Sequence, residues 1–344
     1  MRRLPVSGCD EEVWWRIVVF AVSENWKSIV AAGALLLMSF PAHLHAQQKQ
    51  RNAELQALSP SFWKLIEPKS VVTKVASGFG FTEGPVWDES GYLWVSDETL
   101  NKIFKVDVRS GDKKAVIALG DPDGSTYDKE RRILDCASVL RAVIRLSPDG
   151  KSYAVLADRF EGKRLNSPND VVLGPDGAIY FTDPTSDLPK GERQEIPFKG
   201  VYRIAKNGQL RLLIKDIKDP NGLAFSPDGK RLYVDDSTDQ IIWVYDFLPE
   251  GKVANGRIFG SEKADPKEGV PDGMKVDQAG NLYVVGPRGI WVWSANGEHL
   301  GTIVVPEQPA NLTWGDADYS TLFITAETSV YKIRTKAHGF IPYL

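Results

Sequence analysis

The chain has 344 residues, of which 42% are hydrophobic and 25% are charged, and its formal net charge is -3. These values are typical of a globular protein with one large or two ordinary domains. Because no run of lysine and arginine interleaves with aromatic residues, the sequence does not indicate binding to nucleic acid or to an anionic membrane surface. Small neutral or weakly charged ligands fit this charge better.

Residues 1–46 differ in character from the rest of the chain. An apolar run over residues 28–40 is followed by Pro41, the exit Leu44-His45-Ala46 and a polar stretch over residues 47–50. This is the pattern of a secretory signal peptide, with cleavage predicted near Ala46. The run is shorter than the roughly 20 apolar residues of a spanning helix, although an uncleaved anchor beginning near Val13 stays open. We therefore expect export to the periplasm or the extracellular space, with no stable membrane insertion after cleavage.

Cysteine and histidine are too sparse to support several kinds of site. After cleavage the chain would keep Cys136 without a partner, together with His299 and His338. We therefore expect no disulfide framework. Zinc sites and Ser-His or Cys-His nucleophilic pairs are poorly supported as well.

Residues 47–70 are predicted to form a polar connector with a short helix around Ser61–Ile66. From Val71 to the end, short apolar runs rich in β-branched and aromatic residues alternate with Gly, Pro, Asp and Asn. That pattern predicts β-strands and turns. We assign residues 71–344 to one β domain.

One phrase recurs six times in this domain: a residue with a side-chain oxygen, a short apolar strand, a turn, and a second apolar strand. The six starting residues are Glu83, Asp123, Asn169, Asn221, Asp272 and Asn311, so the spacings are 40, 46, 52, 51 and 39 residues. Such spacing suits four strands in each unit, and six units of four strands predict an all-β, six-bladed β-propeller. The last unit shows only three strands, and we expect Val71–Ala76 to supply the fourth and close the ring.

The six starting residues are expected to meet at one end of the central channel, because each begins the innermost strand of its blade. Their oxygens would form a ring without nitrogen or sulfur ligands. Oxygen ligation of this kind suits Ca²⁺, while Zn²⁺, Mn²⁺ and Mg²⁺ stay open. Asn-Gly and Asp-Gly are also ordinary turn dipeptides, but these pairs recur in register before an inner strand, which favours the metal-site interpretation.

The residues resemble the gluconolactonase and regucalcin (senescence marker protein) family of six-bladed propellers over roughly residues 60–335. The motifs that carry the resemblance are Phe81-Thr-Glu-Gly-Pro-Val-Trp87, Arg164-Leu-Asn-Ser-Pro-Asn-Asp170, Pro220-Asn-Gly-Leu-Ala-Phe-Ser-Pro-Asp-Gly229 and Pro271-Asp-Gly-Met-Lys-Val-Asp277. The resemblance implies that a catalytic divalent ion is held by Glu83, Asn169, Asn221 and Asp272. It also implies hydrolysis of a lactone or sugar-derived substrate, with contacts to substrate from Asn169, Asp123 and Arg164.

Asp272 is the implied activator of water in this family. A calcium-bound carboxylate should titrate below its reference value, whereas a general base works best near the working pH. A second interpretation therefore stays open, in which Asp272 only orients a water molecule that the ion activates.

The chain also departs from the family pattern. Where relatives commonly carry Cys-Glu-His, this chain reads Cys136-Ala137-Ser138, and Ser167 stands where an arginine would precede the third ring residue. Two alternatives to a lactonase therefore stay open: a non-enzymatic, calcium-stabilised propeller that binds a sugar or a protein, and an organophosphate or ester hydrolase at the same site. Both a monomer and a dimer stay open.

The longest predicted loop, residues 184–200, belongs to the same face as the ring. It is interpreted either as a lid or selectivity loop or as a solvated insertion. Its cations Lys190, Arg193 and Lys199 would favour a substrate that carries a carboxylate.

Overall fold

The structure is a computed structural model that describes residues 51–264 and 266–344. The predicted leader, residues 1–46, lies outside the described residues. Within the described part of the chain, no helix is long and apolar enough to cross a membrane.

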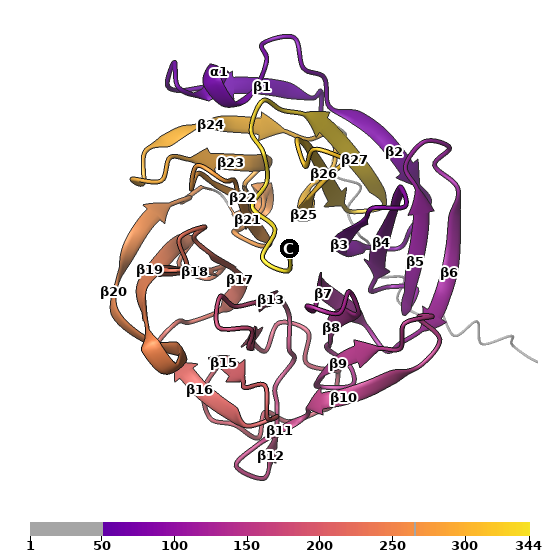
Figure 1. Cartoon of the computed structure of the whole chain (residues 1–344), viewed down its shortest axis with the longest axis vertical. Coiled ribbons are helices and arrows are strands. Elements are labelled where there is room, and N and C mark those ends of the chain that lie inside the picture. The colour runs from indigo at the N-terminus through magenta and orange to yellow at the C-terminus, as the bar shows by residue number, and fades with distance from the viewer. Residues whose placement is uncertain (1–50, 265) are drawn as a thin grey trace, which may run out of the picture. The chain divides into compact units, whose positions relative to one another are not determined.

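Six antiparallel sheets are arranged around a common axis, each with its first strand innermost (Figure 1). The first three blades are β3 (Thr82–Asp88), β4 (Tyr92–Asp97), β5 (Lys102–Asp107) and β6 (Lys113–Ala118); β7 (Pro122–Tyr127), β8 (Ile133–Ala137), β9 (Ala142–Leu146) and β10 (Tyr153–Ala157); and β13 (Val171–Leu173), β14 (Ile179–Asp183), β15 (Gly200–Ile204) and β16 (Leu210–Ile214). The last three are β17 (Pro220–Phe225), β18 (Arg231–Asp236), β19 (Ile241–Leu248) and β20 (Lys252–Ser261); β21 (Met274–Val276), β22 (Leu282–Gly286), β23 (Gly289–Trp293) and β24 (His299–Val304); and β25 (Pro309–Gly315), β26 (Thr321–Ala326), β27 (Ser329–Arg334) and β2 (Thr73–Ser77). The predicted six-bladed propeller of four-stranded blades is confirmed.

The ring closes through β2, which comes from the N-terminal side of the domain and pairs with β27 in the last blade. Ser77 lies opposite Ser329 and Thr73 opposite Lys332. The prediction that an N-terminal strand completes the last blade is therefore confirmed. Closure of this kind joins the two ends of the domain in one sheet and leaves few free strand edges.

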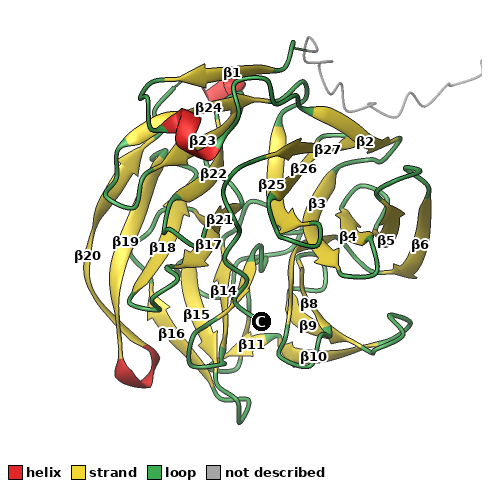
Figure 2. Cartoon of the chain, turned by 45° about the horizontal axis from the view of Figure 1, so that its top comes forward, coloured by secondary structure: helices red, strands yellow, loops and turns green. Residues whose placement is uncertain are grey.

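Several shorter elements lie outside the four-strand pattern. The strand β1 (Glu54–Ala57), which was not predicted, adds to the outer edge of blade 5 by pairing with β24, and the helix α1 (Phe62–Leu65) follows it. A two-stranded hairpin, β11 (Arg159–Phe160) and β12 (Lys163–Arg164), links blades 2 and 3, and the 3₁₀ turns are η1 (Pro249–Gly251) and η2 (Pro266–Glu268). Figure 2 shows how few helical residues the described chain contains.

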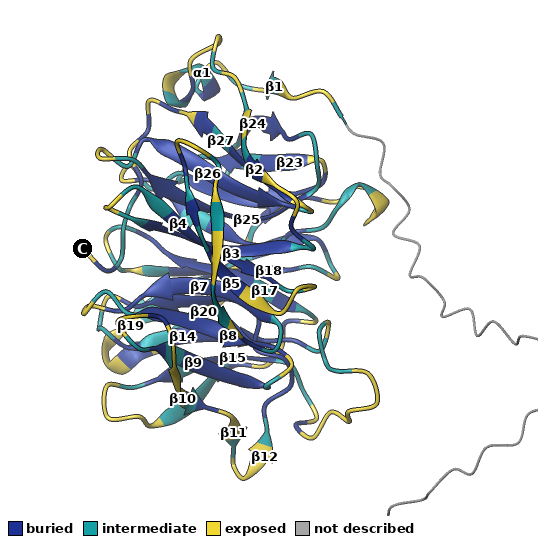
Figure 3. Ribbon diagram, turned by 90° about the vertical axis from the view of Figure 1, so that its right-hand side faces the viewer, coloured by how far each residue is buried: buried dark blue, intermediate teal, exposed yellow. Residues whose placement is uncertain are grey.

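The hydrophobic core is divided among the spaces between neighbouring blades. Trp87 of β3 stacks on Phe323 of β26 with ring centroids 5.4 Å apart, which packs blade 1 against blade 6. Inner strands are covered on both faces: all seven residues of β25 are buried, and so are six of the seven in β3. Figure 3 shows this burial concentrated in the strands, with the exposed residues in loops and outer edges. A polar side chain at the start of an inner strand is therefore held rigidly.

The C-terminal segment, residues 339–344, crosses to the centre of the ring (Figure 1). The Phe340 N–H donates to the carbonyl of Val276 in β21, and Tyr343 packs edge-on against Tyr127 of β7 at 5.3 Å. Together with inner strands of several blades, this segment encloses a cavity of about 30 Å³, enough for about one or two water molecules. The segment therefore closes the channel at the end opposite to the starts of the inner strands.

Candidate metal centre

The structure brings the six predicted ring residues together at the starts of the inner strands. Asn311 donates from Nδ2 to Glu83 Oε2 at 2.9 Å across the junction of blades 6 and 1, and Asn169 donates from Nδ2 to Asp123 Oδ2 at 2.9 Å across blades 2 and 3. Glu83, Asp123, Asn169 and Asn311 are buried, whereas Asn221 and Asp272 keep partial exposure. Solvent therefore reaches part of the ring residues of blades 4 and 5, although not the Oδ1 atom of Asn221.

Glycines that follow four of the ring residues let neighbouring blades approach closely. A Cβ atom on Gly84 would lie 2.1 Å from the carbonyl oxygen of Asp123, and one on Gly222 would lie 2.2 Å from that of Asp272. A Cβ atom on Gly124 would lie 2.4 Å from Asp170 Oδ1 and 2.7 Å from the Asn169 carbonyl oxygen, and one on Gly273 would lie 2.2 Å from the side chain of Asn311. At these four positions the inner strand is thus packed against the next blade, so the glycine that follows the polar residue serves close packing of the ring and not a turn.

Hydroxyl groups on the second strands hold the ring backbone in place. Thr182 Oγ1 donates to the carbonyl of Asn221 at 2.7 Å and accepts from the Asp170 N–H at 3.0 Å, which ties blade 3 to blade 4. Thr325 Oγ1 donates to the Asn311 carbonyl at 3.1 Å. These bonds hold the backbone of Asn221 and Asn311 in place.

Burial and mutual repulsion perturb the carboxylates of the ring. Burial and then the charge of Asp170 raise the pKa of Glu83 to about 8. Burial, followed by the charge of Glu83, raises the pKa of Asp272 well above its usual range. Burial and then the charge of Glu98 do the same to the pKa of Asp123. A cation between these groups would reverse the repulsion and favour their charged forms.

Two of the three ring asparagines have a side-chain oxygen that is free to bind a cation, and the third does not. Asn311 Oδ1 accepts from Lys275 Nζ at 3.2 Å and from the Leu312 N–H at 2.9 Å, so it is already used. Asn221 Oδ1 is buried without a hydrogen-bond partner, which is costly for a polar atom. Asn169 binds its neighbours through Nδ2, which leaves Oδ1 available. Together with Glu83 and Asp272, these two amides make an all-oxygen set that fits calcium.

A cluster of His, Cys, Asp and Glu alone does not form the site. Among the described residues, no group of three or more such side chains is placed to hold a metal ion. The set Glu83, Asn169, Asn221 and Asp272 contains only two carboxylates, so amide oxygens must supply the rest.

Three further carboxylates stand around the ring on connecting loops, and the sequence analysis did not name them. Glu98 follows β4, Asp121 precedes β7, and Asp187 lies in the β14–β15 loop. Asn169 Nδ2 donates to Asp187 Oδ2 at 3.4 Å. Burial and then the charge of Asp187 raise the pKa of Asp121 to about 7. All three come from the loops that strand direction assigns to the ring face, and this signal was present in the sequence.

Asp123 and Arg164, predicted to contact substrate, take different positions. Asp123 is in the ring, where Ser138 Oγ donates to its Oδ2 at 3.2 Å; Ser138 belongs to the segment in which this chain departs from Cys-Glu-His. Arg164 lies on β12, where its guanidinium contacts Glu192 at 3.5 Å and the Leu140 carbonyl at 3.3 Å. The contacts of Arg164 are thus with the β14–β15 loop and blade 2, whereas Asp123 is part of the ring itself.

The sequence profile of the SMP-30/Gluconolactonase/LRE-like region matches residues 81–328, which include all six ring residues. The chain belongs to this family. The gluconolactonase of Zymomonas mobilis is 32% identical over 311 residues, covering 83% of this chain and 87% of the relative. The diisopropyl-fluorophosphatase of Loligo vulgaris is 26% identical over 302 residues, covering 80% and 95%. A solved gluconolactonase from Xanthomonas campestris is 28% identical with a TM-score of 0.75, covering 84% of this chain and 99% of that structure.

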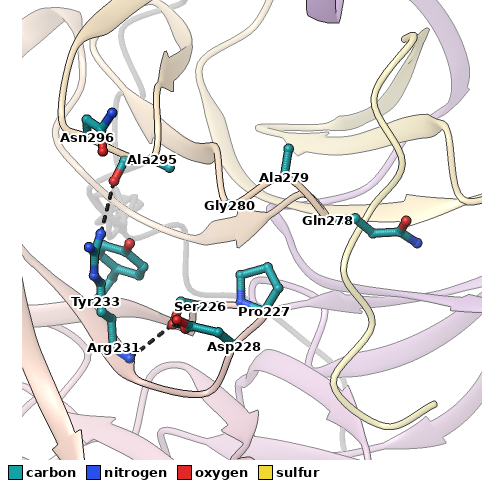
Figure 4. Close-up of a pocket in the computed structure, with 10 residues that line it drawn as sticks. All are labelled: Ser226, Pro227, Asp228, Arg231, Tyr233, Gln278, Ala279, Gly280, Ala295 and Asn296. Atoms are coloured by element: carbon teal, nitrogen blue, oxygen red, sulfur yellow. Dashed lines mark hydrogen bonds between the residues drawn. The ribbon is translucent and has the colours of Figure 1, made fainter.

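A separate surface pocket, of about 270 Å³, is formed by turns of blades 4 and 5 (Figure 4). Its residue Arg231 donates to the Ala295 carbonyl at 3.0 Å and, from its N–H, to Ser226 Oγ at 3.0 Å. Asn221 lies at the start of β17, whereas the turn through Asp228 joins the other end of β17 to the start of β18. This pocket therefore lies on the opposite face and shares no residue with the ring that the gluconolactonase family motifs define.

Proposed function

We propose that this protein is a metal-dependent hydrolase of lactones, with Ca²⁺ held by Glu83, Asn169, Asn221 and Asp272. The observation that carries the proposal is the unpartnered, buried Oδ1 of Asn221 in a ring that also holds Glu83 and Asp272, two carboxyls whose pKa values are raised. Membership of a family whose relatives include gluconolactonases supports the reaction class.

In lactone hydrolysis, water adds to the carbonyl carbon, the ring C–O bond breaks, and the product is a hydroxy acid. A calcium ion at the four residues would polarise the carbonyl oxygen and stabilise the negative charge that develops on it. Asp272 keeps partial exposure as a residue, and its carboxylate would take a proton from the attacking water or orient that water. Asn169 is held through Nδ2, so its Oδ1 would be available to contact the ion.

The test is a panel of lactones assayed with calcium and with a chelator, using the wild type, Asp272→Asn and Glu83→Gln. We expect Asp272→Asn to lower kcat/KM by about 10²–10⁴-fold. Glu298→Gln, an exposed carboxylate in the β23–β24 turn, serves as the control. Activity that survives both ring substitutions and the chelator would show that the site is wrong.

Calcium should also raise the melting temperature, because an ion that binds only the folded state stabilises it. At a concentration 100 times its Kd, the gain is about 2.7 kcal/mol. We expect Glu83→Gln to lose most of this shift. A shift without turnover of any lactone would favour the non-enzymatic propeller that binds a sugar or a protein. Parallel runs with Zn²⁺, Mn²⁺ and Mg²⁺ compare the metals.

The panel includes diisopropyl fluorophosphate and simple esters, because a diisopropyl-fluorophosphatase is among the relatives. Turnover of these compounds without turnover of lactones would move the proposal to the organophosphate or ester hydrolase.

We also propose export, with removal of residues 1–46. Sequencing the N-terminus of the mature protein tests this, and an intact Met1 would contradict it.

A further inference from the structure

The β14–β15 loop, residues 184–199, is anchored at its outer end by a buried arginine. Arg141 is fully buried, and its Nε donates to the carbonyls of Leu165 at 2.6 Å and Asn166 at 3.0 Å. Its Nη1 binds Glu192 of the loop at 3.1 Å. A buried arginine with three acceptors is held in one geometry, so the loop has a fixed attachment point.

Other contacts extend this attachment along the loop. The Arg164 N–H donates to Glu195 Oε2 at 2.9 Å, and Asn166 Nδ2 donates to the Phe198 carbonyl at 3.0 Å. Ile196 is buried to 1% exposure among core residues. The loop is therefore an attached arm and not a freely solvated insertion.

The other end of the arm places a carboxylate at the ring. Asp187 Oδ2 accepts from Asn169 Nδ2 at 3.4 Å and from Ser186 Oγ at 2.8 Å. The backbone before it is held as well, because Ser167 donates to the Pro184 carbonyl from both its N–H, at 3.1 Å, and its Oγ, at 3.0 Å.

The cations of the arm do not balance this carboxylate. Lys199 forms an ion pair with Asp219, and Lys190 and Arg193 are exposed. Lys275 lines the cavity at the C-terminal segment, but its Nζ reaches the ring, where it donates to Asn311 Oδ1 at 3.2 Å and acts on Glu83. The expectation that the loop cations attract a substrate carboxylate is therefore not supported by their positions.

The charges at the open end add up to an excess of carboxylate. A divalent cation and the ammonium of Lys275 would together be balanced by the three ring carboxylates Glu83, Asp123 and Asp272. Glu98, Asp121 and Asp187 remain on the three loops around it. Burial raises the pKa values of all three carboxyls, and a cation at the ring would favour their charged forms. Charges of one sign around a site repel ligands of the same sign, and this effect weakens with salt.

We propose that Asp187, positioned by the Arg141–Glu192 anchor, and its neighbours Glu98 and Asp121 select lactones without a carboxylate over lactones that carry one. This inference rests on the proposed function. The same charges would speed the departure of the hydroxy acid, which is anionic as soon as the ring opens.

The experiment compares kcat/KM for D-glucono-1,5-lactone, which is neutral, and D-glucaro-1,4-lactone, which carries a carboxylate. The wild type should prefer the neutral lactone, and Asp187→Asn should reduce that preference about fivefold, the effect of one charge at about 8 Å in a partly solvated site. Raising the ionic strength should reduce it in the wild type as well. Glu161→Gln, an exposed carboxylate at the tip of the β11–β12 hairpin, is the control with the same change of charge.

A binding measurement separates this inference from the proposed function. Asp187→Asn should bind D-gluconate about fivefold more tightly than the wild type by calorimetry, while binding of D-glucose changes less than twofold. If Asp187→Asn does not fold, Glu98→Gln on another loop makes the same test. Unchanged selectivity and gluconate affinity in both variants would overturn the inference. Failure of the wild type to open any lactone would overturn the proposed function, and the gluconate comparison would still decide the role of the charges.

Discussion

The glycines beside the ring residues set how closely neighbouring blades approach the channel axis. Gly84 has a φ of +45° and lies against the Asp123 carbonyl, so both its backbone conformation and its missing side chain are needed. In the sequence, the repetition of Glu-Gly, Asp-Gly and Asn-Gly before apolar strands identified the ring positions. The contact with the next blade could not be predicted, because it joins residues about 40 positions apart through the packing of whole sheets.

Gly84→Ala is expected to destabilise the folded protein by about 3 kcal/mol, because a Cβ atom would collide with backbone that cannot move alone. Gly208→Ala is a matched control: Gly208 also has a positive φ, of +83°, but a Cβ atom there meets nothing within 4 Å. We expect the control to cost about 1 kcal/mol. Urea denaturation of both variants measures the difference, and equal losses would show that the ring contact carries no extra cost.

Glu262 is a buried carboxyl whose charge the fold disfavours. Trp293 Nε1 donates to its Oε1 at 3.0 Å, its Oε2 has no partner, and burial raises the pKa of Glu262 well above its usual range. The folded protein therefore keeps a proton that the unfolded chain loses near pH 4.5, so this residue lowers stability as the pH rises above that value.

Glu262→Gln should remove this loss while keeping the bond from Trp293. We expect the melting temperature to rise by about 3 °C at pH 8 and to stay nearly unchanged at pH 4.5. Differential scanning calorimetry at the two pH values makes the test, with the exposed Glu298→Gln as control. An equal shift at both pH values would contradict the electrostatic explanation.

Among the secondary-structure elements, the inner strands could be predicted from the sequence, but the strand β1 at the outer edge of blade 5 could not. Periodic apolar runs with turn residues between them identified the strands that begin at Glu83, Asn169, Asn221 and Asp272. The strand β1 was missed because Glu54–Ala57 is only four residues long, too short for its alternation to stand out from the polar connector, and it pairs only with the edge of β24. Arg141 was missed for a related reason: nothing in the local sequence shows that this arginine is buried, or that its partner Glu192 follows 51 positions later.

The C-terminal segment is expected to stabilise the strand that follows Asp272. Deleting residues 339–344 removes the hydrogen bond from Phe340 to Val276 and exposes the surface that Tyr343 covers. We expect a loss of about 2–4 kcal/mol and weaker calcium binding. Thermal melts with and without calcium measure both effects. Deletion of the exposed Leu344 alone is the control, and equal behaviour of the two deletions would contradict the prediction.

For the whole molecule, the ring of six blades and its closure by β2 followed from the sequence, because repeats of 39–52 residues leave few other architectures. The charge around the ring could not be predicted from the sequence. It depends on which loop side chains turn toward the axis, and Asp187 and Lys199 belong to one loop yet have opposite fates: one contacts Asn169, and the other pairs with Asp219.

The C-terminal segment also has a kinetic consequence, because it leaves the channel with one entrance. Substrate and product must then pass through the same opening one after the other, because no second opening lets a substrate enter while the product leaves. Under the proposed function, the hydroxy acid product would occupy the entrance that the next lactone needs. We therefore expect the product to inhibit competitively with the lactone, and we expect kcat to depend on the rate of product release.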